Sequence, residues 1–193
     1  MRMGLRQATV SACSDRGEGL GRADMRAQDR KLRLALAVFE ATVSLDPVLA
    51  ALLQQGIPLS RIGLILCADY AARLEPETPG PSSGDVPLDV LVRGLRPLSQ
   101  TASGGPILAS PCLLEHWSSG LHLPALWGDT ASADGEPRLA PDLERHVKSG
   151  SVIVAAESVT PREQWQCMRV LLRQSSSSVL ALECALPPPK TDS

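Results

Sequence analysis

Two stretches of the chain repeat one plan, and this repeat limits the possible folds more than any other feature. Residues 34–67 and 152–184 each contain an apolar strand, a turn that carries a glutamate, a helix that begins near a proline, and a second apolar strand. Each stretch is therefore predicted to be a β-α-β unit, with the right-handed crossover that nearly all such units share. Two units side by side predict a ferredoxin-like sandwich, an α+β fold with a mainly antiparallel sheet and helices on one face.

The first unit begins with an apolar strand at residues 34–39. Asp46 and Pro47 are predicted to start its helix, because an aspartate accepts free amide hydrogens and a proline in the first turn loses no hydrogen bond. Gly56 is predicted to end the helix, since glycine enters the left-handed conformation without steric cost. Residues 62–67 form the return strand. The predicted buried face of the helix consists of Val48, Leu49, Leu52 and Leu53.

The second unit begins with an apolar strand at residues 152–156. Thr160 and Glu163 match a capping box, in which the two residues satisfy free amide hydrogens at the start of a helix. The polar run 175–178 then returns the chain to a strand at 179–182. The predicted buried face of this helix consists of Trp165, Met168, Leu171 and Leu172.

The segment between the two units has weaker local signals. Proline, glycine and serine are abundant at 74–87, which predicts an exposed loop. The other predicted elements are a helix within 88–98 that ends before Pro97, a strand at 105–109, a helix from Ser110 to Trp117, an apolar loop at 121–128, a flexible loop at 129–138, and a helix from Leu139 to Val147 with a Glu144–Lys148 ion pair.

The chain of 193 residues is long enough for one domain with a substantial core, predicted over residues 31–186. Residues 1–30 and 187–193 are predicted to be disordered tails. No apolar run approaches the roughly 20 residues of a membrane helix, and no secretion signal is recognisable. A net charge of −2 with scattered arginines argues against a nucleic-acid surface. We therefore expect a cytoplasmic protein that contacts neither membrane nor nucleic acid.

The five cysteines form no C-x-x-C pair, so neither a zinc ribbon nor a thioredoxin-like motif is present. Cys112 lies in the first turn of a predicted helix, where the helix dipole lowers the pKa of a thiol, and His116 follows one turn later. This pair allows a thiol-dependent enzyme or a metal protein, or simply a helix that packs through other residues. Glu40 and Glu157 follow equivalent strands and are predicted to be solvated. No catalytic residue, metal ligand or cofactor is predicted.

Several strands are apolar on successive residues, which indicates that both faces of the sheet are covered. The second layer could be the middle segment or another copy, and the sequence favours a homodimer through the sheet face. Trp117 and Trp127 bracket an apolar stretch that includes Leu123. Exposed, these three residues would bind a partner or a small ligand of unknown identity, because tryptophan often anchors interfaces. Buried, they would cover the core.

Several short segments resemble the heat-induced general stress protein family (YflT-like). They are Val38-Phe39 before a helix, the turn Gly56-Ile57-Pro58, the strand and turn at 62–70, the strand at 105–109, and residues 146–154. The resemblance implies a β-α-β repeat and no catalytic residues. The leading hypothesis is a non-enzymatic cytoplasmic protein that acts through oligomerisation or partner binding in a stress or regulatory setting. The alternatives are a ligand sensor near Trp117 and Trp127, and a thiol or metal protein at Cys112 and His116.

Overall fold

The structure is a computed structural model, and it describes six ranges of the chain. These are residues 31–74, 87–102, 105–118, 124–128, 138–174 and 178–185. The tails predicted at 1–30 and 187–193 lie outside the described residues. So do the loops predicted at 74–87 and 129–138, apart from residues 74, 87 and 138.

The core of the fold is one six-stranded sheet in the order β3-β4-β2-β5-β1-β6, in which every neighbouring pair is antiparallel. The first strand of each repeat lies between the two strands of the other repeat, so the two β-α-β units interlock. The strands are β1 (Lys31–Phe39), β2 (Ile62–Cys67), β3 (Arg96–Ala102), β4 (Gly105–Ala109), β5 (Val152–Ser158) and β6 (Ser178–Ala185).

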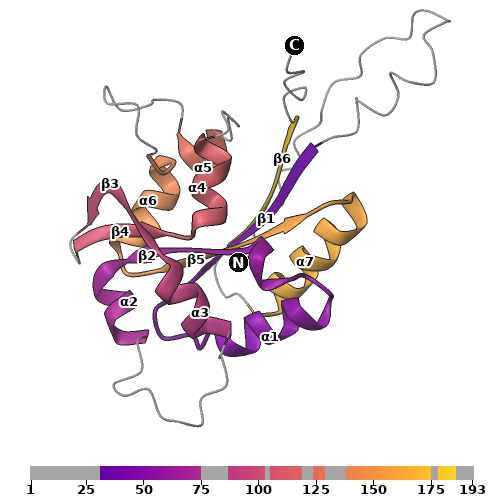
Figure 1. The fold of residues 1–193 in the computed structure, drawn as a ribbon, viewed down its shortest axis with the longest axis horizontal. Helices are drawn as coiled ribbons and strands as arrows, with labels where there is room; N and C mark the ends of the chain where they lie inside the picture. Colours follow the sequence, from indigo (N-terminus) through magenta and orange to yellow (C-terminus); the bar gives the residue numbers. More distant parts are fainter. Residues whose placement is uncertain are drawn as a thin grey trace, which may run out of the picture.

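Helices cover both faces of this sheet (Figure 1). The crossover helices α1 and α7 lie on one side together with α3, whereas α4, α5 and α6 lie on the other. The prediction of helices on one face is therefore wrong, because the middle segment supplies a second layer over β2 and β5. The helices are α1 (Asp46–Gln54), α2 (Ala68–Leu74), α3 (Pro87–Gly94), α4 (Pro111–Ser118), α5 (Pro124–Trp127), α6 (Pro141–Lys148) and α7 (Pro161–Gln174), with a short 3₁₀ helix η2 (Leu59–Arg61).

Burial on both faces explains the continuous apolar runs in the strands. All six residues of β2 are buried, and in β1 only Lys31 is exposed. Gly63 in β2 makes room for the second layer, because a Cβ atom there would lie only 2.7 Å from the side chain of Leu113 in α4. Helix α4 therefore packs directly on the backbone of β2.

Helix α1 forms where it was predicted, although its start differs in detail. Leu45 occupies the N-cap position without a side-chain cap, and Asp46 lies in the first turn instead. The end is as predicted, since Gly56 follows with a φ of 84°. Of the predicted apolar face, Leu53 is half-buried, and the fully buried residues are Val48, Leu49 and Leu52.

Helix α7 begins with the predicted capping box. The backbone amide of Glu163 donates to Thr160 Oγ1 at 3.1 Å, and Glu163 Oε2 accepts from the backbone amide of Val159 at 2.6 Å. The second bond reaches one residue further back than the usual pattern, in which the glutamate accepts from the cap residue itself.

The buried face of α7 is rotated from its predicted position. The side chain of Gln164 is buried, and its Nε2 donates to the main-chain oxygens of Leu34 at 3.1 Å and Leu182 at 3.0 Å. Leu171 is buried as predicted and Met168 is half-buried. Trp165 and Leu172 were predicted to be buried but are 58% and 59% exposed. A polar residue thus takes the position that hydrophobicity alone assigned to tryptophan.

The helix predicted within 88–98 ends at Gly94, before Pro97 as expected, because the residue before a proline avoids the helical region. Strand β3, which begins at Arg96, was not predicted, and its edge position tolerates Pro97. The predicted strand at 105–109 and the helices after Ser110 and Leu139 are present. Helix α2 was not predicted, and α5 forms within the predicted apolar loop.

Candidate functional site

Helix α4 is attached to the sheet at Ser110, the residue before its first turn. The backbone amide of Ser110 donates to the oxygen of Leu64 at 2.9 Å, and the Leu64 amide donates back to Ser110 Oγ at 2.8 Å. The serine side chain thus replaces a backbone acceptor where the β2–β4 pairing ends. These two bonds fix the position of Cys112, two residues further along.

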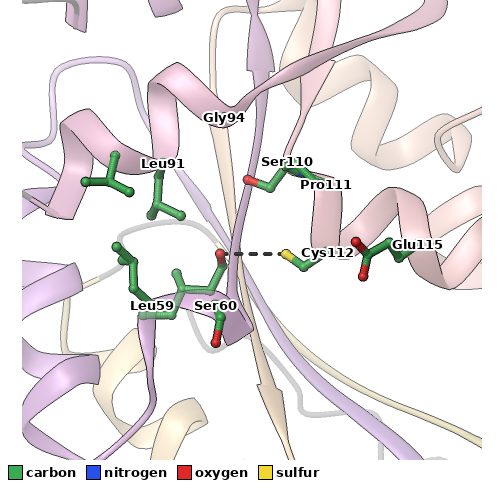
Figure 2. Close-up of a pocket in the computed structure, with 10 residues that line it drawn as sticks. Leu59, Ser60, Leu91, Gly94, Ser110, Pro111, Cys112 and Glu115 are labelled. Carbon is green, nitrogen blue, oxygen red and sulfur yellow. Dashed lines mark hydrogen bonds between the residues drawn. The ribbon is translucent and has the colours of Figure 1, made fainter.

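The thiol of Cys112 points toward β2 and donates to the main-chain oxygen of Ile62 at 3.7 Å (Figure 2). Burial raises the pKa of this thiol to about 11, and the nearby carboxylates of Glu157 and Glu115 add to the increase. Hydrogen bonding from the backbone of Leu113 opposes it only in part. Burial thus outweighs the helix-start effect that the sequence suggested, and the thiol is protonated at neutral pH.

His116 contacts a carboxylate of the second repeat. Its Nε2 lies 3.5 Å from Oε2 of Glu157, which faces α4 from strand β5. The hydrogen bond from His116 lowers the pKa of Glu157, burial opposes this effect, and the charges of His116 and Arg61 lower the pKa further. Glu157 is thus a half-buried partner and not the solvated turn residue that was predicted, whereas Glu40 is exposed.

These polar groups do not form a metal site. Among the residues that the structure describes, no three histidine, cysteine, aspartate or glutamate side chains gather in an arrangement that could hold a metal ion. Arg61 extends the polar cluster away from Cys112, since its Nη1 lies 3.3 Å from Oε1 of Glu163 at the start of α7. These contacts connect η2 with α7 and α4 with β5, so the polar cluster holds separate elements of the fold together.

A pocket of about 310 Å³ opens between η2, α3 and the start of α4 (Figure 2). Its wall is mainly apolar, and its polar groups come from serine, cysteine and glutamate side chains. The residues that line it are Leu59, Ser60, Ile62, Val90, Leu91, Gly94, Ser110, Pro111, Cys112 and Glu115. Of these residues, only Cys112 was a candidate in the sequence, as a thiol or metal ligand. The pocket itself was not predicted, because its lining comes from three segments that are far apart in the sequence.

The predicted site at Trp117, Leu123 and Trp127 is only partly described. Trp127 lies in α5 with a fully buried side chain that belongs to the core. Trp117 lies in α4, but its side chain is outside the described part of the structure, as is the whole of Leu123. A ligand at Trp127 would therefore have to displace a core side chain.

Exposed apolar residues gather at the end of the molecule formed by α7 and β6. Trp165, Leu172 and Val159 are each more than half exposed. Leu180 in β6 is 40% exposed on the opposite face of the sheet, because the strand register places it on the same face as Gly63, which lies against α4. The guanidinium of Arg169 lies over the Trp165 ring, 4.8 Å from its centroid. Sequence reasoning missed this surface because it assigned Trp165 and Leu172 to the core.

Comparison of the chain with protein-family models, with curated proteins and with solved structures found no match. Within the described ranges, no helix combines the length and the apolar character that crossing a bilayer requires. The function must therefore be inferred from the geometry of the described residues.

Proposed function

We propose that this chain is a non-enzymatic, ferredoxin-like binding protein that forms a homodimer through the outer edge of strand β6. The strand order β6-β1-β5-β2, with α1 and α7 on one face, supports the ferredoxin-like assignment, because it is the order expected of a β-α-β-β-α-β unit. On this assignment, the segment from α2 to α6 is an insertion between β2 and β5. The short segments that resemble the general stress protein family favour a stress or regulatory setting for the dimer.

The observation that carries the proposal is the difference between the two edges of the sheet. Edge strand β3 contains Pro97 and a register irregularity between Pro97 and Thr101, and both features hinder pairing with another strand. Edge strand β6 contains neither proline nor lysine. Its one charged residue, Glu183, pairs within the chain with Lys31 at 3.6 Å and Arg33 at 3.3 Å. Strand β6 therefore lacks the features that keep an edge unpaired.

The exposed apolar side chains lie where a second copy would contact them. Helix α7 packs over β1 and β6. One flank of this helix includes Val170 and packs toward the core. Trp165 and Leu172 are two helical turns apart, so they form one stripe on the flank away from Val170. This flank borders the β6 edge, and Leu180 of the same strand is exposed on the other face of the sheet. Strand pairing and helix contact would then occur in one interface.

A second copy is the partner that fits this edge best. Two identical edges can pair antiparallel about a two-fold axis, which gives a closed dimer and satisfies the backbone groups of both strands. The sheet face is a weaker choice for this interface, because α4 and α6 already pack on β2 and β5. We therefore place the interface at the edge of the sheet rather than on its face.

Solution mass by light scattering, on the full chain, tests this proposal. Leu180→Lys should shift the protein from dimer to monomer, because a buried charge would replace an apolar contact. The matched control is Val90→Lys on α3, since Val90 is also 40% exposed but lies far from β6 in the fold. A wild-type monomer at every concentration would overturn the proposal. So would an L180K variant that stays dimeric.

A further inference from the structure

A line of arginines runs along the outward side of helix α7, which lies at the outside of one sheet face (Figure 1). Arg162, Arg169 and Arg173 are all exposed, and helical geometry directs them within about 40° of one another. This line, the α7 ridge, extends for about 17 Å along the helix. Trp165 and Leu172 lie about 70° to one side, on the flank that borders β6. The α7 ridge is therefore separate from the flank that we place in the dimer interface.

The α7 ridge keeps its positive charge within the described part of the chain. No ion pair connects its three arginines to another residue that the structure describes, whereas Arg145 and Lys148 of α6 both pair with carboxylates. The only carboxylate of α7 is Glu163, on the flank opposite to Trp165. Glu163 already contacts Arg61 at 3.3 Å and accepts from the backbone amide of residue 159 at 2.6 Å. It is thus engaged away from the ridge.

The middle arginine of the ridge is held in place by an aromatic ring. The guanidinium of Arg169 lies 4.8 Å from the centroid of the Trp165 ring. Stacking on a ring orients the guanidinium plane and leaves its N–H groups able to donate to a carboxylate. Because the group is already ordered, less side-chain entropy is lost when a partner binds. Arg169 is therefore pre-organised to receive an anionic group.

We infer that the α7 ridge binds an acidic segment of a partner protein, with carboxylates paired to Arg162, Arg169 and Arg173. Guanidinium groups suit this partner, because each can donate two parallel hydrogen bonds to one carboxylate. A segment of about five extended residues, or about three helical turns, covers the length of the ridge. The ridge belongs to one copy of the chain, so this inference goes beyond the proposed dimer and does not depend on it.

Two other polyanions fit the α7 ridge less well. A helix that lies on a membrane inserts its apolar side into the bilayer, but the outward side of α7 carries arginines and its apolar residues lie on a flank. A nucleic-acid surface is usually strongly basic over a whole domain, whereas this chain has a net charge of −2. A short acidic segment has to match only the ridge itself, and the observations favour it for this reason.

Titration of the full chain with an octaglutamate peptide, followed by amide NMR shifts, tests this inference. An octaglutamine peptide is the matched control, because it has the same length and no charge. At about 20 mM salt we expect saturable octaglutamate binding with a dissociation constant of about 0.1–1 mM and at least tenfold weaker binding of octaglutamine. The shifts should concentrate at residues 161–174, and binding should weaken at least fivefold at about 0.3 M salt.

Two double variants locate the peptide. Arg162→Gln with Arg173→Gln should weaken octaglutamate binding at least fivefold. Arg93→Gln with Arg145→Gln removes the same charge from α3 and α6 and should weaken binding less than twofold. All four side chains are exposed, so both variants should fold.

Three results would overturn the inference. The first is the absence of saturable octaglutamate binding, and the second is an equal loss of binding in the two double variants. The third is tighter binding of another polyanion at residues 161–174, either the oligonucleotide octathymidylate or phosphatidylserine vesicles, which would make a nucleic acid or a membrane the partner instead.

Discussion

Nε2 of His116 lies 3.5 Å from Oε2 of Glu157, and this contact ties the middle segment to the second β-α-β repeat. His116 comes from helix α4, which packs on β2, and Glu157 comes from β5, the neighbour of β2 in the sheet. The contact therefore holds the second layer in place, and its strength should depend on the charge of Glu157.

Stability should depend on pH through this carboxylate. The folded protein lowers the pKa of Glu157 from its ordinary value of 4.5, chiefly through the hydrogen bond from His116. A lowered folded pKa gives stabilisation that is complete above the unfolded pKa and is lost as the pH falls through the folded pKa. Glu157→Gln should therefore cost about 0.5–1 kcal/mol at pH 6, and this cost should shrink as the pH approaches 3.

Urea unfolding of the wild type and the Glu157→Gln variant at both pH values measures this effect. Glu144→Gln is the control, because Glu144 is half-buried to a similar degree but forms its ion pair with Lys148 within helix α6 (i,i+4). The control should lose a few tenths of a kcal/mol at most. An equal loss for Glu157→Gln at pH 6 and pH 3 would show that the charge of Glu157 plays no part.

Gln164→Glu should destabilise the fold more than Gln164→Leu. The amide nitrogen of Gln164 donates to two main-chain oxygens, and both bonds bring α7 onto the β1–β6 pair. A carboxylate cannot donate, so it would face two acceptors in a buried position. We expect a loss of about 2–4 kcal/mol at pH 7 from urea unfolding, and a smaller loss at acid pH, where the protonated acid regains a donor. A glutamate variant as stable as the wild type would contradict the role of Gln164.

Cys112 should react slowly with iodoacetamide in the native protein. Its pKa of about 11 lies two units above the ordinary value of 9.0, so about 100-fold less thiolate is present at neutral pH. Peptide mass spectrometry after alkylation at pH 7.5 measures the reaction, and the denatured chain supplies the reference rate. Selective alkylation of Cys112 in the native protein would instead favour the thiol-dependent enzyme.

The strands and helices of the two repeats could be predicted from the sequence because their signals are local. Apolar runs marked β1, β2 and β5, and the capping box at Thr160 and Glu163 marked the start of α7. Gly56 marked the end of α1, because glycine enters the left-handed conformation that it adopts there. Each signal depends on residues within one or two turns of the chain, so the sequence alone carries it.

The features that failed depend on contacts between distant residues. The hydrophobic pattern predicted that Trp165 lies in the core. Gln164 occupies the buried position instead, because its amide donates to two carbonyl oxygens on neighbouring strands. No local pattern in the sequence marks Gly63 as a packing position, although the close approach of Leu113 to β2 depends on this glycine. The pocket was missed for the same reason, since η2, α3 and α4 meet only in the folded chain. Long-range hydrogen bonds and packing are not encoded in any short pattern.

Hydrogen–deuterium exchange at increasing protein concentration tests the central claim, dimerisation through β6, most directly. Pairing of two edges would protect backbone amides of Ser178–Ala185 that face away from β1, because they would donate to the second copy. We predict that exchange in this strand slows as the concentration rises through the dissociation constant of the dimer, while exchange in Arg96–Ala102 at the opposite edge stays constant. Exchange in β6 that does not depend on concentration, or protection that arises in β3 instead, would contradict the claim.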